Sequence, residues 1–314
     1  MFKEKLQENF PLADLSTFKI GGNAEFFAQL ETKQDIEEAF AWAKEQNKVV
    51  TILGGGSNIL INDNGVKGLV IKLHNTDLSF EESNIICGAS VDVWHLAEQA
   101  FDKSLSGIEW SIGIPGSVGG AIRGNAGAHG GSFDKVVETV TVFDAEGFSW
   151  KTFTNKESNF TYRTSRFKLE PHFIIWEISL HLKTSEDKSA MKEAMDGYRK
   201  YRVESQPKEP SAGCIFKNLF AADVEKQNKE LYDKALSEQK VKGNKIGAGY
   251  LIESLNLKGF EFGGAKISEK HANFIVNANE ASAAEVRVIM KKVKEEVKKN
   301  FNIELEEEVQ LLGF

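Results

Sequence analysis

The chain has 314 residues, of which 41% are hydrophobic and 27% are charged, a balance typical of globular proteins that bury a sizeable core. A formal net charge of −7 argues against a general affinity for nucleic acid, and no apolar run is long enough to span a membrane. The N-terminus lacks the apolar core of a signal peptide, and two cysteines do not suggest a disulfide framework. We therefore expect a protein of the cytoplasm, with two or three domains and no membrane insertion. We also expect a monomer, although composition and charge do not determine the oligomeric state.

The first part of the chain predicts a helix, a strand and a glycine-rich loop. Thr32–Gln46 has apolar residues at helical spacing, and Thr32 with Asp35 has the pattern of a capping box. Val49–Leu53 is typical of a buried strand, and Gly54-Gly-Gly-Ser-Asn58 follows it. Because strand-like sequence continues after the glycines, the loop matches neither a Rossmann glycine loop nor a P-loop. Its consecutive backbone N–H groups can still bind a pyrophosphate, although three glycines also fit an ordinary turn.

The second glycine-rich segment, Ile112–Gly131, is longer and poorer in side chains. Ordering such a segment is entropically unfavourable, and a bound ligand or close backbone packing usually offsets that cost. A large flat cofactor lying on exposed peptide groups is one interpretation, and a series of turns between strands is the other. Asn125 can serve as a side-chain donor and acceptor, whereas His129 is more typical of an ordinary loop residue.

Beyond this segment the pattern predicts strands and then a helix. The polar and aromatic loop Asn159–Phe167 carries Arg163, although loop arginines are usually solvated. Lys188–Val203 has the pattern of a helix, and we expect a domain boundary within Thr184–Arg202. The three expected strands are Val136–Phe143, Ser149–Thr154 and Ile174–Leu182.

The stretch Ser211–Asn218 places a thiol, Cys214, after small residues and before a cation and an amide. A turn built from Ser, Ala and Gly lets the backbone approach a ligand closely. The thiol can donate a proton, and Lys217 and Asn218 can hold phosphate or hydroxyl oxygens. A small buried cysteine in a tight turn is the alternative interpretation.

The remainder of the chain predicts a polar insertion, a long helix and a final strand. Leu219–Lys245 is rich in Lys and Glu, and we expect an exposed helical excursion or a lid there. Glu280–Lys299 has one apolar stripe at helical spacing, and Ser282 with Glu285 suits a capping box. Ile303–Leu312 has the alternation of a strand.

Eight ordered landmarks make the chain similar to the UDP-N-acetylenolpyruvoylglucosamine reductases, the MurB family of peptidoglycan synthesis. Each landmark is modest alone, but eight in this order over nearly the whole chain form a specific pattern. The interval from Tyr162 to Cys214 is too short for the extra tyrosine-bearing loop of one subtype, so the chain resembles the shorter subtype. The landmarks are Ser16–Gly22, Leu53–Asn58, Gly113–Gly120, Asn125–Gly127, Tyr162-Arg163, Pro210–Asn218, Ala248–Ile252 and Ser268–Asn277.

The resemblance implies an α+β protein, in which an FAD-binding fold of the vanillyl-alcohol oxidase type is followed by a separate α+β substrate-binding domain. It implies two FAD-binding subdomains at 1–75 and 76–200 and a substrate-binding domain at 201–314. It also implies non-covalent FAD, NADPH as co-substrate, a nucleotide-sugar substrate and no metal. The residues that it implies for cofactor binding are Gly54, Gly55, Gly56, Ser57, Asn58, Ile114, Pro115, Gly116, Gly119, Gly120, Asn125, Ala126 and Gly127.

The implied reaction is NADPH-dependent reduction of UDP-N-acetylglucosamine enolpyruvate to UDP-N-acetylmuramate through FAD. Hydride reaches the enolpyruvyl methylene carbon from the reduced flavin, which leaves negative charge on the adjacent carbon and its carboxylate. Arg163 matches the family position that balances this charge. Cys214 stands where the family commonly has a Ser as general acid, and a thiol is mostly protonated at neutral pH. The family's third catalytic residue, a Glu before Val in the last strand, corresponds to Glu308.

The pattern alone does not choose among the three consecutive glutamates, because strand alternation puts Glu307 on the apolar face and Glu308 on the other face with Glu306. Only the resemblance points to Glu308. Lys217 and Asn218 match phosphate- and sugar-contacting positions, and Lys258 and His271 are weaker matches. The residues that the resemblance implies for substrate binding are Tyr162, Arg163, Lys217, Asn218, Lys258 and His271.

The chain departs from the family at Leu219, which follows Asn218 where the family usually has Pro and which begins the long insertion. Two alternatives stay open at this point. One is a flavin oxidase of the same superfamily acting on a small alcohol or sugar. The other is a protein that binds flavin or a nucleotide sugar without turnover.

Overall fold

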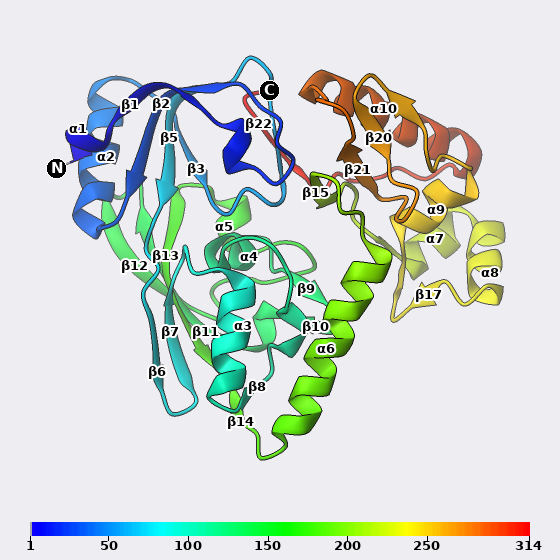
Figure 1. Cartoon of the computed structure of the whole chain (residues 1–314), viewed down its shortest axis with the longest axis horizontal. Helices are drawn as coiled ribbons and strands as arrows, with labels where there is room; N and C mark the ends of the chain where they lie inside the picture. The colour runs from blue at the N-terminus through cyan, green and yellow to red at the C-terminus, as the bar shows by residue number, and fades with distance from the viewer. Residues whose placement is uncertain (1) are drawn as a thin grey trace. The chain divides into compact units, whose positions relative to one another are not determined.

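The computed structural model describes residues 2–314, which form two compact units that alternate along the chain (Figure 1). Unit 1 consists of residues 2–10, Ala24–Gly55 and Lys67–Glu204, and unit 2 of Pro11–Asn23, Gly56–Val66 and Ser205–Phe314. The chain therefore changes unit inside the first glycine loop, after Gly55. The division at 75/76 and 200/201 stays a prediction. Among the described residues, no helix is both long and apolar enough to cross a bilayer.

The larger sheet of unit 1 has five antiparallel strands in the order β12-β11-β13-β7-β6. The three strands predicted after the second glycine segment are confirmed, and their inward side chains, such as Val140 and Ile178, are fully buried. This alternation lets the sheet cover one hydrophobic core. The strands are β12 (Ser149–Thr154), β11 (Val137–Asp144), β13 (Phe173–His181), β7 (Asn84–Gly88) and β6 (Leu78–Glu81).

A second sheet of four strands, in the order β1-β2-β5-β3, lies mostly in unit 1 and is accompanied by α2 (Lys33–Glu45). The capping box predicted for this helix is confirmed: Thr32 accepts from the Asp35 N–H, and Asp35 accepts from the Thr32 N–H. The strands are β1 (Gln7–Pro11), β2 (Asn23–Leu30), β5 (Val66–Leu73) and β3 (Val50–Leu53), and the chain begins with α1 (Phe2–Lys5).

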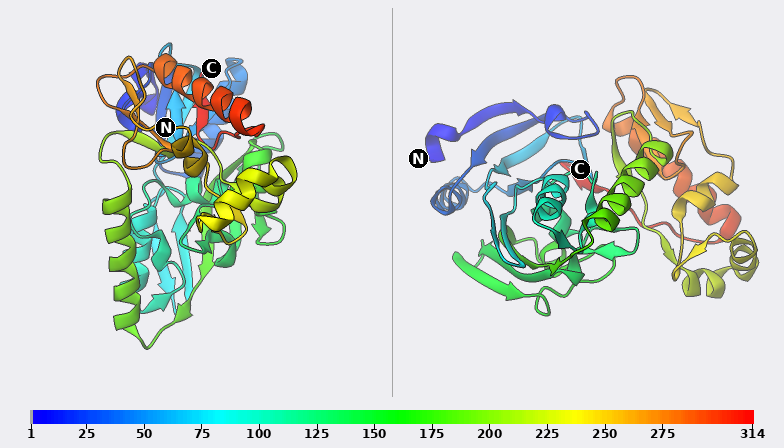
Figure 2. Two further views of the ribbon diagram at one scale, coloured as in Figure 1. Left: turned by 90° about the vertical axis from the view of Figure 1, so that its right-hand side faces the viewer. Right: turned by 60° about the horizontal axis from the view of Figure 1, so that its bottom comes forward.

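The helix α6 (Lys188–Ser205) confirms the predicted helix and is the last element of unit 1. It lies beside α3 (Val93–Asp102), to which Arg199 is joined by a 2.7 Å ion pair with Glu98 (Figure 1, Figure 2). A short helix that the pattern did not predict, α4 (Val118–Arg123), lies inside the second glycine segment. The remaining elements of unit 1 are α5 (Arg166–Leu169), β8 (Leu105–Ser106), β14 (Lys183–Thr184), β9 (Gly127–Ala128), β10 (Gly131–Ser132) and the 3₁₀ turns η2 (Glu109–Ser111) and η3 (Phe133–Lys135).

Unit 2 is built on an antiparallel sheet in the order β15-β21-β20-β19, together with the long helix α10 (Ala283–Phe301). The predicted capping box of Ser282 and Glu285 is confirmed, and the apolar stripe of the helix is buried. The strands are β15 (Ser211–Cys214), β21 (Phe274–Asn277), β20 (Ala265–Ile267) and β19 (Glu261–Phe262), and η1 (Ala13–Leu15) also belongs to this unit.

The polar insertion Leu219–Lys245 forms two helices, α7 (Ala221–Gln227) and α8 (Lys229–Ser237). Its helical character and the exposure of most of its side chains are confirmed. The insertion is nevertheless packed on unit 2, because Val224 and Leu231 are buried in the core of that unit. A role as a lid stays a prediction. Around it lie β16 (Leu219–Phe220), β17 (Val241–Lys242), β18 (Lys245–Ile246) and α9 (Ala248–Ser254).

The predicted final strand, Ile303–Leu312, was wrong over most of its length. Only β22 (Gln310–Leu312) is a strand, and it pairs in parallel with β4 (Ile59–Ile61). Before it the backbone makes a single isolated bridge, between Glu307 and Phe216. The apolar residues at 303, 305 and 309 alternate because they are buried in the core of unit 2, not because a ladder continues there.

Candidate active site

The two glycine-rich loops contact each other directly within unit 1. A Cβ atom added to Gly55 would lie 2.5 Å from Gly116 Cα and 2.6 Å from the Ser117 nitrogen. A side chain at Gly55 would therefore separate the loops. Close backbone packing is thus one reason for the glycines, as the composition of the second segment had suggested.

The same contact leaves a bare patch of backbone that fits a flat ligand. Gly54 and Gly120 are exposed, and both lie beside the Ser117 hydroxyl. The Ser117 Oγ would lie 3.1 Å from a Cβ atom added to Gly54 and 3.4 Å from one added to Gly120. Side chains at these glycines would fill this space, so the patch suits the approach of a cofactor such as FAD. Gly119 has a different task, because it is buried against Ala89.

The amide of Asn125 is used inside the protein. Its Nδ2 donates to the Thr161 carbonyl at 3.0 Å, and its Oδ1 accepts from the Asp134 N–H at 3.1 Å. Asn125 is buried, with φ of 41°. It therefore ties the second glycine segment to the loop that carries Arg163. Its neighbours Ala126 and Gly127 lead into the short hairpin of β9 and β10.

The end of α6 holds both ends of the second glycine segment. The Arg202 Nε donates to the Ile112 carbonyl at 3.1 Å, and the His129 ring stacks on Tyr198 with centroids 4.4 Å apart. The Tyr201 ring meets His129 edge-on at 5.2 Å. Burial, and then the charge of Arg202, lowers the pKa of His129. The sequence did not single out the last turn of α6. The contacts of this turn explain how a segment so poor in side chains is ordered. Ile114 and Pro115 follow the Arg202 contact directly.

The arginine predicted to balance charge lies in a strained turn of unit 1. Arg163 has φ of 56°, a left-handed conformation that non-glycine residues adopt rarely and that is found often at functional sites. A two-residue bridge between Thr161 and Thr164 closes the turn. The guanidinium carbon lies 5.8 Å from the ring centroid of Tyr162, and Lys168 donates to the Arg163 carbonyl. These contacts fix the backbone of Arg163 and place the ring of Tyr162 beside its guanidinium.

In unit 2 the segment that carries Cys214 lies beside the segment that carries Glu306, Glu307 and Glu308. Cys214 is partly exposed at the end of β15, and the Glu308 N–H donates to the carbonyl of the next residue, Ile215, at 2.7 Å. Asn273 fixes this turn, since its buried amide accepts from the Phe216 N–H at 3.0 Å and donates to the Phe216 carbonyl at 2.8 Å. The sequence did not single out Asn273.

The structure separates the three glutamates that the pattern could not. Glu306 forms an ion pair with Lys217, and Glu307 forms one with Lys294 at 3.1 Å. Glu308 is the glutamate whose N–H bonds to the turn that bears Cys214. The two preceding glutamates are thus engaged with lysines.

The second half of the first glycine loop, Gly56–Asn58, lies beside this cluster within unit 2. The Asn58 amide donates to the Glu308 carbonyl at 3.2 Å. Thr17 joins the loop to the cysteine strand, because its N–H donates to the Gly56 carbonyl and its hydroxyl to the Ser211 carbonyl at 2.7 Å. Loop residues predicted to bind the cofactor are therefore held against residues predicted to catalyse.

The residues predicted to bind substrate in unit 2 surround α9. Asn218 Oδ1 accepts from the Ala248 N–H at 3.2 Å, and Lys258 pairs with Glu253 at 2.6 Å. His271 Cε1 lies 3.4 Å from a Cβ added to Gly249. Burial, followed by the nearby charge of Lys258, lowers the pKa of His271. The structure thus gathers Asn218, Lys258 and His271 at one helix, which their positions in the sequence did not predict.

The two cysteines differ in environment. Cys87 is fully buried in β7, and burial, with a smaller effect of Glu177, raises the pKa of its thiol to about 12. Cys214 is partly exposed. Cys87 is therefore inert at neutral pH, whereas Cys214 can meet a ligand.

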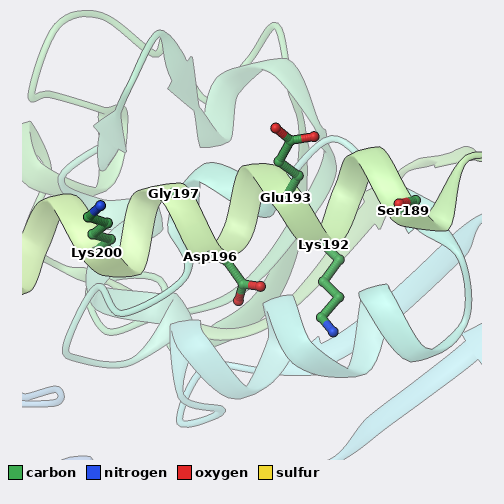
Figure 3. A pocket seen from close by; sticks show the side chains of 6 residues that line it. All are labelled: Ser189, Lys192, Glu193, Asp196, Gly197 and Lys200. Carbon is green, nitrogen blue, oxygen red and sulfur yellow. The ribbon is translucent and has the colours of Figure 1, made fainter.

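A surface hollow on α6 lies apart from these residues. Figure 3 shows Lys192 and Asp196 projecting on one side of the helix and Glu193 on the other. It is lined by α6 alone and contains none of the predicted site residues. The hollow is therefore an uneven stretch of helix surface. Its lining residues are Ser189, Lys192, Glu193, Asp196, Gly197 and Lys200.

Comparison with known proteins assigns the two groups of predicted site residues to two different domains. Residues 24–152 match the family model of an FAD binding domain. Residues 206–312 match the C-terminal domain of UDP-N-acetylenolpyruvoylglucosamine reductase. The first match includes both glycine-rich loops, and the second includes the cluster around Cys214 and Glu308.

Relatives match over almost the whole chain. The UDP-N-acetylenolpyruvoylglucosamine reductase of Bacillus pumilus is 35% identical, covering 98% of this chain and 94% of the relative. That of Bacillus subtilis is 34% identical, with the same coverage of both chains. The crystal structure of the enzyme from Thermus caldophilus superposes with a TM-score of 0.76 at 30% identity, covering 98% of both chains. The chain belongs to the UDP-N-acetylenolpyruvoylglucosamine reductase family.

Proposed function

We propose that this protein reduces UDP-N-acetylglucosamine enolpyruvate to UDP-N-acetylmuramate, with NADPH as the electron donor and FAD as the cofactor, for the synthesis of peptidoglycan precursors. The observation that carries the proposal is the Cys214–Glu308 cluster. This cluster lies in the part of the chain that matches the C-terminal domain of the reductase family, and an FAD binding domain precedes it. The cluster places a thiol and a carboxyl group on adjacent backbones, where a proton can be given to a substrate.

FAD, when bound, supplies hydride transfer from NADPH to the enolpyruvyl methylene carbon. Gly54, Gly55, Gly116 and Gly120 would hold it through bare backbone, with the Ser117 hydroxyl beside them. Gly56, Ser57 and Asn58 belong to the same loop. We propose non-covalent binding, since the patch is made of peptide groups and small residues and contains neither a histidine nor a cysteine to which a flavin could be tethered.

Arg163 is the residue that we propose to balance the charge developing on the substrate carboxylate. A guanidinium forms two parallel hydrogen bonds with a carboxylate, which fixes both distance and orientation. In support of this role, the left-handed turn sets where the Arg163 side chain leaves the backbone, and the ring of Tyr162 lies beside its guanidinium. Such a preorganised cation stabilises charge that appears only in the transition state.

Cys214 is the proposed general acid, which gives its Sγ proton to the substrate carbon after hydride arrives. Asn273 holds the turn that carries the thiol, and this limits its motion. Glu308 supplies a second proton-exchanging group on the neighbouring backbone. Lys217, Asn218, Lys258 and His271 would contact the nucleotide sugar.

An anaerobic experiment tests the proposed reaction. The purified yellow protein is bleached with NADPH, and UDP-N-acetylglucosamine enolpyruvate is then added. Return of the visible flavin absorbance, with one UDP-N-acetylmuramate formed per flavin, is the expected result. Reoxidation by oxygen but not by this substrate would identify an oxidase instead, and bound flavin that NADPH does not bleach would contradict the proposed electron donor.

We also propose that the protein acts as a monomer in the cytoplasm. Light scattering coupled to size exclusion, at the concentration used for activity, should give the mass of one chain. Twice that mass at this concentration would contradict the monomer.

A further inference from the structure

Both lysines proposed to contact the substrate are already paired with carboxylates of the same unit. Lys217 is paired with Glu306, and Lys258 with Glu253 at 2.6 Å. In each pair the carboxylate is the more exposed partner: 72% against 14% for the first pair, and 56% against 28% for the second. An anion arriving from solvent would therefore meet the glutamate before it reaches the lysine.

The pairing of Lys217 with Glu306 is built into the backbone. The Lys217 N–H donates to the Glu306 carbonyl at 2.9 Å, and the neighbouring residues Phe216 and Glu307 form an antiparallel bridge. Asn273 in turn fixes Phe216 through both of its backbone polar groups. The backbone thus keeps the two residues opposite each other, within reach of an ion pair.

The second pair is local to α9. Glu253 lies in the last turn of the helix, which ends at Ser254, and Lys258 follows in the next loop. The imidazole of His271 lies close enough to feel both charges, since Lys258 lowers its pKa and Glu253 opposes that effect. A charged ligand that reaches His271 therefore interacts electrostatically with Lys258 and Glu253.

We propose that Glu306 and Glu253 determine ligand specificity by occupying the phosphate-binding lysines in place of the substrate. This inference rests on the proposed function, because it takes Lys217 and Lys258 as contacts of the nucleotide diphosphate. A tethered carboxylate is present at high effective concentration, so an anion displaces it readily only if it also makes contacts beyond the lysine. Inorganic phosphate makes no such contacts, whereas a nucleotide diphosphate adds those of its second phosphate and its nucleoside.

The test is the affinity of the FAD-loaded protein for UDP, measured by titration calorimetry with Glu306→Gln, Glu253→Gln and the double variant. Each exposed ion pair is worth about 0.2–1 kcal/mol, so each single variant should bind UDP about 1.5- to 5-fold more tightly. The two pairs share no residue, so the double variant should gain roughly the product of the two factors. Inorganic phosphate should compete with UDP in the double variant at concentrations that leave the wild type unaffected.

Glu304→Gln is the matched control, because it removes the same charge from the same segment. Glu304 is 82% exposed and pairs with Lys298 at 3.1 Å, and Lys298 is not among the proposed substrate residues. It should leave UDP affinity nearly unchanged. An effect of Glu306→Gln no larger than that of Glu304→Gln would overturn the proposal, since net charge alone would then explain it.

Lys217→Met separates failure of this inference from failure of the proposed function. If Lys217→Met weakens UDP binding while Glu306→Gln matches the control, Lys217 binds phosphate and only the competition by glutamate is refuted. If Lys217→Met leaves UDP binding unchanged, the assignment of Lys217 to the phosphate fails, and this inference fails with it. Thermal unfolding of each variant confirms that the compared proteins are folded.

Discussion

In unit 1 the candidate site is made mostly of peptide groups, because two loops without side chains touch each other and leave exposed backbone beside Ser117. In unit 2 it is made of ionisable side chains, held on backbones that pair around Cys214 and Glu308. The first arrangement suits recognition of a ligand by its shape, and the second suits proton transfer. The two should therefore fail in different ways when one residue is changed.

A change in the glycine loops adds atoms where backbones already touch, so it should abolish cofactor binding as a whole. A change in the unit 2 cluster removes one functional group from a packed turn, so it should slow one step and leave the cofactor bound. Arg163 tests the boundary of this rule, since it belongs to unit 1 but is proposed to act through its side chain.

The largest expected effect is that of Gly55→Val. The new side chain would collide with Gly116 and Ser117, at 2.5 and 2.6 Å from its Cβ, and force the two loops apart. The purified protein should be colourless, as measured by flavin absorbance per chain. Gly197→Ala in α6 is the control, because its added Cβ meets nothing within 4 Å, and it should keep normal flavin and gain up to about 1 kcal/mol of stability. Normal flavin in Gly55→Val would show that the loop contact is dispensable.

Cys214→Ala should keep its flavin and lose roughly 10²–10⁴ in turnover, the usual contribution of a positioned general acid. Reduction by NADPH should stay normal, because that step needs no proton from Cys214. Cys214→Ser should keep substantial activity, since a hydroxyl can replace the thiol. Stopped-flow measurement of flavin reoxidation by substrate decides the matter. A near-normal rate in Cys214→Ala would mean that the thiol only packs the turn.

Arg163→Ala should slow hydride transfer to the substrate by about a hundred- to a thousandfold, the typical loss for one preorganised donor. Flavin content and reduction by NADPH should be nearly unaffected, because the balanced charge appears only when the substrate is reduced. Separate stopped-flow traces of the two half-reactions give the comparison. If both half-reactions slow equally, Arg163 positions the flavin. Its substitution would then act on the cofactor, as changes in the glycine loops of unit 1 do.

The smallest effect concerns one histidine in each unit. The pKa values of His129 and His271 are lowered by burial, so the folded protein binds fewer protons than the unfolded chain near pH 6. The stability from each neutral ring is present above the unfolded pKa of about 6.5 and is lost as the pH falls below it. The loss is up to about 1.4 kcal/mol per pH unit for the half-buried His271, and it is smaller for His129, which is exposed and screened by solvent.

Urea unfolding at pH 7.5 and 5.5 measures this loss. His129→Gln and His271→Gln should each reduce the difference between the two pH values. Because His129 packs on the helix end that holds the glycine segment, only His129→Gln should also change flavin release at pH 5.5. Unfolding that is equally pH-dependent in the wild type and both variants would contradict the lowered pKa values.

The sequence predicted the elements whose signals are local. The capping boxes of α2 and α10 and the apolar stripe of α10 depend on residues within a few turns, and the structure reproduces them. It did not predict α4, because glycine has a low helix propensity. That helix depends on distant partners: the Val118 and Gly119 N–H groups donate to the carbonyls of Val91 and Ala89.

Site residues followed the same rule. The pattern identified Cys214 and the glycine loops, but it could not separate Glu306, Glu307 and Glu308. Their roles depend on which lysine or backbone lies opposite, and this is set by contacts between segments far apart in the chain. Asn273 escaped notice for the same reason, since an asparagine that fixes a turn looks like any other in the sequence.

The unequal cysteines give the molecule a reporter that needs no engineering. A maleimide at neutral pH should label one thiol per folded chain, at Cys214, and a second only when the sheet that buries Cys87 opens. The label count then measures opening of unit 1, while the rate of the first label measures access to the turn in unit 2. One reagent thus follows both units in the same sample, and protection of the first thiol by a bound nucleotide would read out ligand binding without any optical change in the flavin.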